Sequence, residues 1–192
     1  MIDPIVANTA LVKAGQALQM EGATLAMAAS LSTLAQASCV LLMGFLGDRF
    51  RRRSVLMAAL LLAITGDGIA LATSTPVLFL LGRALAGIGV GGVLVLSFAA
   101  VHAVSHPNQL AKSLGVWTLL SLAGFVAGTL LGGVLADGSW RLALGLVPLI
   151  ALICLPITPA LLPEMPANTE LRADWRGLTS IAAAMVLVLS GV

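Results

Sequence analysis

Long apolar runs separated by short polar segments dominate the pattern of the chain. Five runs, at residues 23–46, 54–73, 76–101, 114–135 and 141–162, are each long enough to cross a membrane as a helix. The runs are continuous and do not alternate with polar positions, which favours helices over the strands of a barrel. The pattern therefore predicts an all-α integral membrane protein.

Two shorter apolar segments lie near the ends, at residues 2–18 and 177–192. Neither is long enough to cross about 30 Å of hydrocarbon by itself, because a helix rises only about 1.5 Å per residue. We interpret residues 2–18 as a truncated first span, with an interfacial N-terminal helix as the alternative. Residues 177–192 are expected to begin a seventh span, after a polar cytoplasmic linker at residues 164–176.

The composition supports this class and narrows the chemistry. The chain is 59% hydrophobic and 9% charged, with a mean hydropathy of +1.08, whereas soluble domains are about 45–50% apolar and about 25% charged. Cys39 and Cys154 both lie within apolar runs, which disfavours a disulfide or a metal pair. No nucleophile–base pair or metal cluster is visible. We therefore expect no enzyme, no cofactor, no metal and no nucleic-acid partner.

Charge is concentrated in one segment, residues 44–53, which holds Asp48 and four arginines. A short basic segment between two spans marks the cytoplasmic side of a membrane. On that assignment, seven basic residues face the cytoplasm and two, Lys13 and Arg141, face outward. The pattern therefore predicts that the loop at residues 47–53 is cytoplasmic.

The same segment resembles the loop between the second and third spans of major facilitator superfamily transporters, whose pattern is roughly G-x-L-A-D-R-x-G-R-R. The matching residues are Gly44, Leu46, Asp48, Arg49, Arg52 and Arg53. Arg51 replaces the second glycine of that pattern. The resemblance implies that Asp48 and its arginines engage the opposite half of a transporter and hold one conformation, while a plain basic loop is the alternative.

Two further resemblances point to the drug:proton antiporter branch of this family. Residues 3–11 are loosely similar to a first-span pattern, D-x-T-I-V-N-V-A-L-P, which places Asp3 inside the membrane. Residues 83–89 are similar to a fourth-span pattern, R-x-x-Q-G-x-G, which begins at Arg83. The resemblance implies that Asp3 and Arg83 are intramembrane charges and candidates for proton coupling.

Asp67 offers a second partner for Arg83. An unpaired arginine within a span is costly, so a counter-charge is expected. Asp67 and Arg83 are each about seven to nine residues from the turn near residues 74 and 75, so antiparallel helices bring them to similar depth. We therefore hypothesise that Asp67 is the structural partner and that Asp3 is left to carry a proton. The alternative is that Asp67 reaches headgroups or a wet cavity.

Glycines recur along the fifth predicted span at Gly124, Gly128, Gly132 and Gly133. This series resembles the antiporter signature G-x-x-x-G-P-x-x-G-G, with Thr129 in place of the proline. Proline bends a helix strongly and threonine only weakly. A general packing seam of small residues, which allows a neighbouring backbone to approach closely, is the alternative.

The resemblance implies the N-terminal six-helix bundle of a major facilitator fold, with span one truncated. It also implies a multi-pass protein of the plasma (inner) membrane that moves small molecules by alternating access. The function expected is proton-coupled efflux of drug-like or apolar compounds. The partners implied are the bilayer, the substrate, protons, and a missing C-terminal bundle or a second copy. The alternatives are a non-transporting fragment, a membrane assembly partner, or a half-transporter active only as a dimer.

Overall fold

The computed structural model describes residues 13–20, 22–162, 177, 180, 183 and 184. Asp3, the expected linker at residues 164–176 and most of the expected seventh span lie outside the described residues. Within them, residues 13–17 are helical.

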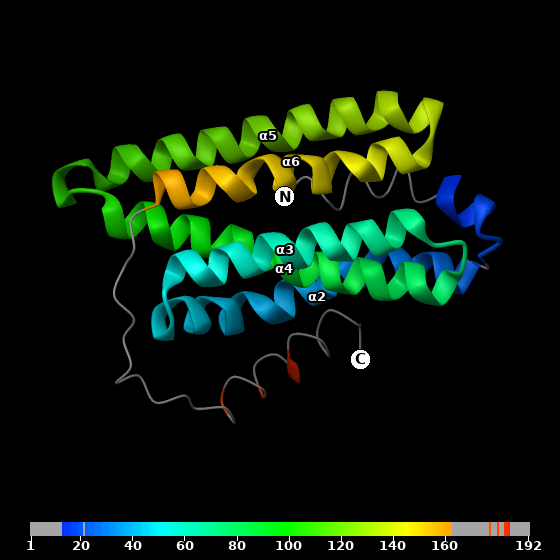
Figure 1. The fold of residues 1–192 in the computed structure, drawn as a ribbon, viewed down its shortest axis with the longest axis horizontal. Helices are drawn as coiled ribbons and strands as arrows, with labels where there is room; N and C mark the ends of the chain where they lie inside the picture. The colour runs from blue at the N-terminus through cyan, green and yellow to red at the C-terminus, as the bar shows by residue number, and fades with distance from the viewer. Residues whose placement is uncertain (1–12, 21, 163–176, 178–179, 181–182, 185–192) are drawn as a thin grey trace.

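Five long helices lie lengthwise beside one another and run in alternating directions (Figure 1). They are α2 (Gly22–Arg49), α3 (Arg52–Ala72), α4 (Pro76–Val104), α5 (Leu110–Gly138) and α6 (Trp140–Leu161), with a short 3-10 helix, η1 (Pro107–Gln109), before α5. Each of the five is long and apolar enough to cross a membrane. The expected fold class, an all-α integral membrane protein, is confirmed.

The segment expected as a loop at residues 47–53 is mostly helical. Residues 47–49 belong to the last turn of α2, and α3 begins at Arg52, so only Phe50 and Arg51 connect the two helices. Arg51 has φ −67° and ψ 112°, an ordinary extended backbone. An arginine therefore fits where the family pattern has a glycine. The apolar pattern missed the extra turns because α2 and α3 continue into charged residues, and arginine is a good helix former.

Proline and threonine set the connection between α3 and α4. Pro76 is the first residue of α4, where its missing N–H costs no helical hydrogen bond. Just before it, the Thr75 amide donates a hydrogen bond of 3.1 Å to the hydroxyl oxygen of Thr73. This short turn makes α3 and α4 antiparallel neighbours.

Helix α4 lies at the centre of the described bundle and contacts α2, α3 and α5. Its buried positions are largely small, which lets neighbouring backbones approach closely. These are Gly82, Ala86, Gly87, Gly89, Gly91, Gly92 and Ala100. Helix α6 packs on α3 and α5, and it runs through three internal prolines, which membrane helices tolerate better than soluble ones.

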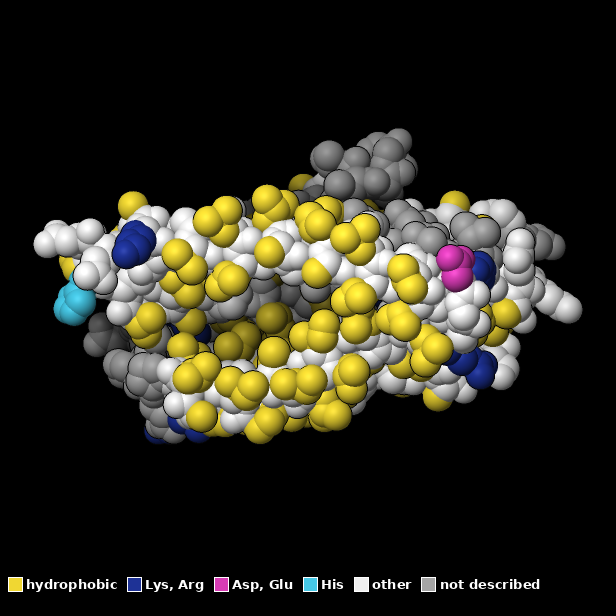
Figure 2. Space-filling view, turned by 90° about the horizontal axis from the view of Figure 1, so that it is seen from above, with side chains coloured by type: hydrophobic (Ala, Val, Ile, Leu, Met, Phe, Trp, Pro, Cys, Tyr) yellow, Lys and Arg dark blue, Asp and Glu magenta, His cyan; other side chains and the backbone are white. Residues whose placement is uncertain are grey.

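The two ends of the bundle carry different residues. We call the end formed by Arg49, Arg52, Val104, Leu110 and Leu161 the arginine end. At the opposite end α3 turns into α4 and α5 into α6. Figure 2, which views the α5 and α6 side, shows hydrophobic side chains along the length of this face and charged side chains mainly toward its ends. This distribution suits helices that cross a bilayer.

Candidate functional site

A buried ion pair joins α3 to α4. The Nη1 atom of Arg83 donates a hydrogen bond of 3.4 Å to Oδ1 of Asp67, and each side chain is 1% exposed. Among the described residues, these are the two charged side chains with full burial. The structure therefore brings together the two residues that the depth argument paired. Asp3, the other candidate partner, lies outside the described residues.

Two glycines position this pair. Gly66 precedes Asp67 and Gly82 precedes Arg83. A Cβ atom added to Gly82 would lie 2.6 Å from the Gly66 carbonyl oxygen, and one added to Gly66 would lie 2.3 Å from the Ala86 amide nitrogen. The α3 and α4 backbones are thus in direct contact beside the charges. The sequence showed Gly66 next to Asp67, but the matching role of Gly82 became visible only with the two helices side by side.

The burial of the pair determines what it can do. Separate charges in the bilayer interior are costly, so a paired aspartate and arginine are far less costly than either alone. Such a pair holds two helices in register, and a change in the protonation of the carboxylate would alter that contact. The pair is therefore both a structural joint and a candidate for coupling to ion movement.

Three helices meet at Arg52, at the arginine end. The Nη2 atom of Arg52 forms a salt bridge with Asp48 of α2, and its Nη1 atom donates a hydrogen bond of 3.0 Å to the Ala99 carbonyl oxygen of α4. Asp48 remains accessible, with a side chain that is 53% exposed. Within the described bundle, Arg52 thus connects α2, α3 and α4. The wider role expected for Asp48 and its arginines, contact with an opposite half, stays a prediction.

The glycine series of α5 divides into two groups. Gly128 and Gly132 are buried together with Ala136, at every fourth position along one face of the helix. Gly133 lies off this face, and an added Cβ there would meet nothing within 4 Å. Thr129 donates a hydrogen bond of 2.8 Å to the Phe125 carbonyl oxygen of its own helix. The face formed by Gly128, Gly132 and Ala136 is the buried face of α5.

An ion pair at the opposite end was not anticipated from the sequence. The Nζ atom of Lys13 donates hydrogen bonds of 2.7 Å to the Ala136 carbonyl oxygen and 3.2 Å to Oδ1 of Asp137. A cation at the last turn of a helix interacts favourably with its free carbonyls. The sequence assigned Lys13 to the outer side, but it did not reveal that residue 13 and α5 are neighbours.

The described residues contain no cluster of three or more His, Cys, Asp or Glu side chains that could hold a metal ion. His102 and His106 are both exposed, near the end of α4.

The family model described as Major Facilitator Superfamily matches residues 2–191. This chain belongs to the Major Facilitator Superfamily. Its expected family resemblance is thus confirmed, and it is a multi-pass membrane protein of that superfamily.

Several members of the superfamily are similar to this chain over most of its length. The inner membrane transport protein YnfM of Escherichia coli (strain K12) is 31% identical over 136 residues, which cover 70% of this chain and 33% of that protein. A multidrug resistance protein B homolog of Mycobacterium tuberculosis is 28% identical over 161 residues, which cover 83% of this chain and 30% of that protein. An uncharacterized MFS-type transporter of the same species is 26% identical over 151 residues, which cover 78% of this chain and 22% of that protein. The chain thus spans a third or less of these relatives.

A solved structure supports the fold. The crystal structure of the human organic anion transporter MFSD10 (TETRAN) superposes with a TM-score of 0.64 at 22% sequence identity. The match covers 93% of this chain and 43% of that one. The helices of this chain therefore have the arrangement of part of that structure.

Proposed function

We propose that this chain forms the first of two helix bundles in a transporter that exports small, largely apolar molecules in exchange for protons. The observation that carries the proposal is the buried pair of Asp67 and Arg83 in a superfamily chain. Ionisable residues inside a membrane are costly and are functional-site candidates by default. The similarity to a multidrug resistance protein B homolog supports the efflux direction.

The proposed mechanism is alternating access between two bundles that rock about a central substrate site. Arg83 and Asp67 hold α3 against α4, so that this bundle moves as a unit. Asp3 is the proposed proton carrier. Asp48 and the arginines beside it, Arg49, Arg52 and Arg53, are proposed to contact the other bundle in one of the two states. A contact made in only one state shifts the equilibrium toward that state.

The proposed location is the plasma (inner) membrane, with the arginine end in the cytoplasm. The excess of basic residues at this end supports the orientation. The partners proposed are the bilayer, a small-molecule substrate, protons, and either a C-terminal bundle or a second copy of the chain.

The test compares this chain alone with this chain joined to the C-terminal bundle of the Escherichia coli relative. Each protein is reconstituted in liposomes, and the movement of a fluorescent lipophilic cation is followed after a pH gradient is imposed. We expect transport from the joined protein and none from the chain alone, since one bundle cannot enclose a central site. Transport by the chain alone would favour a dimeric half-transporter. A joined protein that folds and still moves no cation would contradict the proposed efflux.

A further inference from the structure

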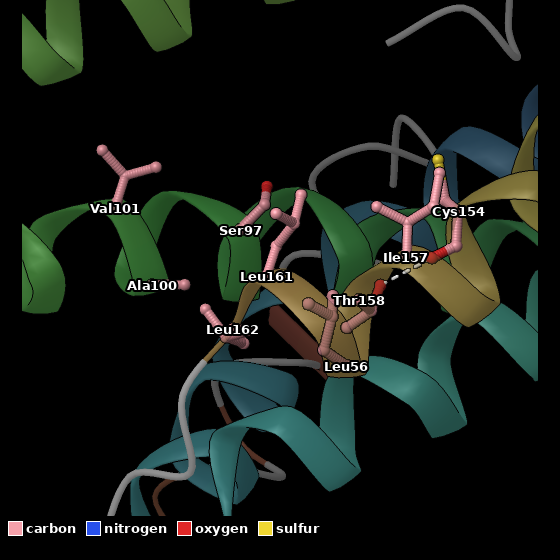
Figure 3. Close-up of a pocket in the computed structure, with 9 residues that line it drawn as sticks. All are labelled: Leu56, Ser97, Ala100, Val101, Cys154, Ile157, Thr158, Leu161 and Leu162. Carbon is pink, nitrogen blue, oxygen red and sulfur yellow. Dashed lines mark hydrogen bonds between the residues drawn. The ribbon is translucent and has the colours of Figure 1, made fainter.

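A groove near the arginine end lies between α3, α4 and α6. It has a volume of about 270 Å³ and is lined by Leu56 of α3, Ala100 and Val101 of α4, and Ile157 and Leu161 of α6, among others. Figure 3 shows the α4 residues on one side and the α6 residues on the other. A hollow between the side chains of α5 and α6 is visible toward the same end in Figure 2.

The polar atoms in this lining are already used. The Ser97 hydroxyl donates a hydrogen bond of 3.0 Å to the Leu94 carbonyl oxygen. The Thr158 hydroxyl donates one of 2.8 Å to the Cys154 carbonyl oxygen, which is dashed in Figure 3. Pockets for drug-sized molecules usually present a few convergent polar groups and occupy about 300–1,000 Å³. This groove is smaller and offers hydrocarbon contacts, so its lining suits a single hydrocarbon chain.

The groove extends inward from the level of the charged residues. Leu56 is one helical turn from Arg52, about 6 Å along α3 at 1.5 Å per residue. On α6 the lining reaches from Leu161, at the helix end, to Cys154, about 10 Å deeper. A groove of this depth can hold the part of an acyl chain nearest its headgroup, when the headgroup lies at the arginine end.

The charge at the mouth of the groove is positive. Arg52 lies four residues before Leu56 and Arg53 three residues before it, so both share its face of α3. Arg52 is fixed there by its hydrogen bond to the Ala99 carbonyl oxygen, next to Ala100 in the lining. The described residues at this end include five basic residues and one acid: Arg49, Arg51, Arg52, Arg53, Lys112 and Asp48. Basic clusters beside a membrane attract anionic headgroups.

We propose that this groove binds one acyl chain of an anionic phospholipid, with the headgroup over the arginines at the mouth. The apolar lining provides contact for the chain, and the arginines select the headgroup. This inference does not depend on the proposed transport activity, since it concerns only the surface of this bundle and the leaflet at the arginine end.

The native cysteines provide a direct test. Cys154 is exposed and lines the groove, whereas Cys39 lies on α2 and does not. The purified chain in neutral detergent is treated with N-ethylmaleimide, and modification of each thiol is followed by peptide mass spectrometry. Phosphatidylglycerol or phosphatidylcholine with identical acyl chains is added beforehand. We expect phosphatidylglycerol to slow modification of Cys154 at concentrations about fivefold lower than phosphatidylcholine does, the preference expected from one engaged arginine.

The rate at Cys39 should stay the same with either lipid. Equal protection of Cys154 by the two lipids, or equal slowing at both cysteines, would overturn the proposal. This measurement uses the unaltered chain, so it does not depend on whether a variant folds.

A pair of variants tests the position of the groove. Cys154→Trp fills the groove, whereas Leu152→Trp places the same ring outside the groove, at a position of α6 that is 54% exposed. Both are extracted from vesicles that contain equal amounts of the two lipids, and the retained phospholipid is quantified. We expect Cys154→Trp to lose the excess of phosphatidylglycerol and Leu152→Trp to keep it. Retention of that excess by Cys154→Trp would overturn the proposed site. The Arg53→Gln variant should reduce the excess of phosphatidylglycerol without abolishing retention of phosphatidylcholine.

Discussion

At the scale of single residues, Asp67 and Arg83 each make the burial of the other tolerable. Both side chains are 1% exposed, and Nη1 of Arg83 lies 3.4 Å from Oδ1 of Asp67. Breaking such a pair by removal of one partner typically costs about 3–5 kcal/mol, because a buried charge is left without compensation. Removing both charges together avoids that cost.

Asp67→Asn is therefore expected to lower the free energy of unfolding by about 3–5 kcal/mol, and adding Arg83→Leu should recover much of the loss. The measurement is thermal unfolding in detergent for the two single variants and the double variant. Asp137→Asn is the control, since its partner Lys13 is at the surface and exposed pairs contribute at most about 1 kcal/mol. Additive losses in the double variant would show that the two side chains do not depend on each other.

The sequence predicted the Asp67–Arg83 pair because the two helices share a short turn, which fixes their relative depth. It did not predict the Lys13–Asp137 pair, since residues 13 and 137 are far apart in the chain and nothing local indicates that they meet. Pairing within a hairpin follows from counting residues, whereas pairing between distant segments depends on the packing of the whole bundle.

At the scale of helices, close approach between α3 and α4 depends on positions without a side chain. Gly82→Ala would place a methyl group 2.6 Å from the Gly66 carbonyl oxygen, a backbone atom that can move only with its helix. Gly68→Ala adds the same methyl group where nothing lies within 4 Å. We expect Gly82→Ala to lower the thermal unfolding midpoint. Gly68→Ala should leave it unchanged or slightly higher, because alanine favours helix over glycine by about 1 kcal/mol. Equal effects would contradict the close α3–α4 contact.

The buried face of α5 leads to a second prediction at this scale. Gly128→Leu should reduce the yield of folded protein far more than Thr129→Ala, because Gly128 is on the buried face of α5, where small residues allow helices to pack. Thr129 is only partly buried, and its hydroxyl bonds within its own helix. Gly133→Leu is the matched control, since that position is open. The yield is measured as the monodisperse fraction in size-exclusion chromatography, and similar losses for Gly128→Leu and Gly133→Leu would show that the buried face is incidental.

Helix ends were the least predictable part of these elements. The apolar pattern ended the second span at residue 46, but α2 continues to Arg49. The pattern began the fifth span at residue 114, but α5 begins at Leu110. A hydropathy pattern reports where hydrocarbon ends and not where the helix ends. Charged residues such as Asp48 and Arg52 extend helices into the headgroup layer, and their own salt bridge favours this extension.

At the scale of the whole molecule, the fold class followed from the number and length of the apolar runs. The functional roles did not follow, because they concern contacts beyond this bundle. Asp48 forms a salt bridge with Arg52 and is half exposed at the arginine end, and its proposed contact with a second bundle or a second copy stays a prediction. The chain spans a third or less of the curated relatives it matches.

The orientation of the bundle leads to the last prediction. Ser54 is exposed near the arginine end, and Gly138 is exposed at the opposite end with nothing within 4 Å of an added Cβ. Single cysteines are placed at these two positions in a chain whose Cys39 and Cys154 are replaced by serine. The excess of basic residues at the arginine end should retain it in the cytoplasm. An impermeant thiol reagent should therefore label Gly138→Cys in intact bacterial cells, and Ser54→Cys only after permeabilisation. The reverse pattern would invert the topology, and equal labelling of both positions in intact cells would show that the arginines do not set a single orientation.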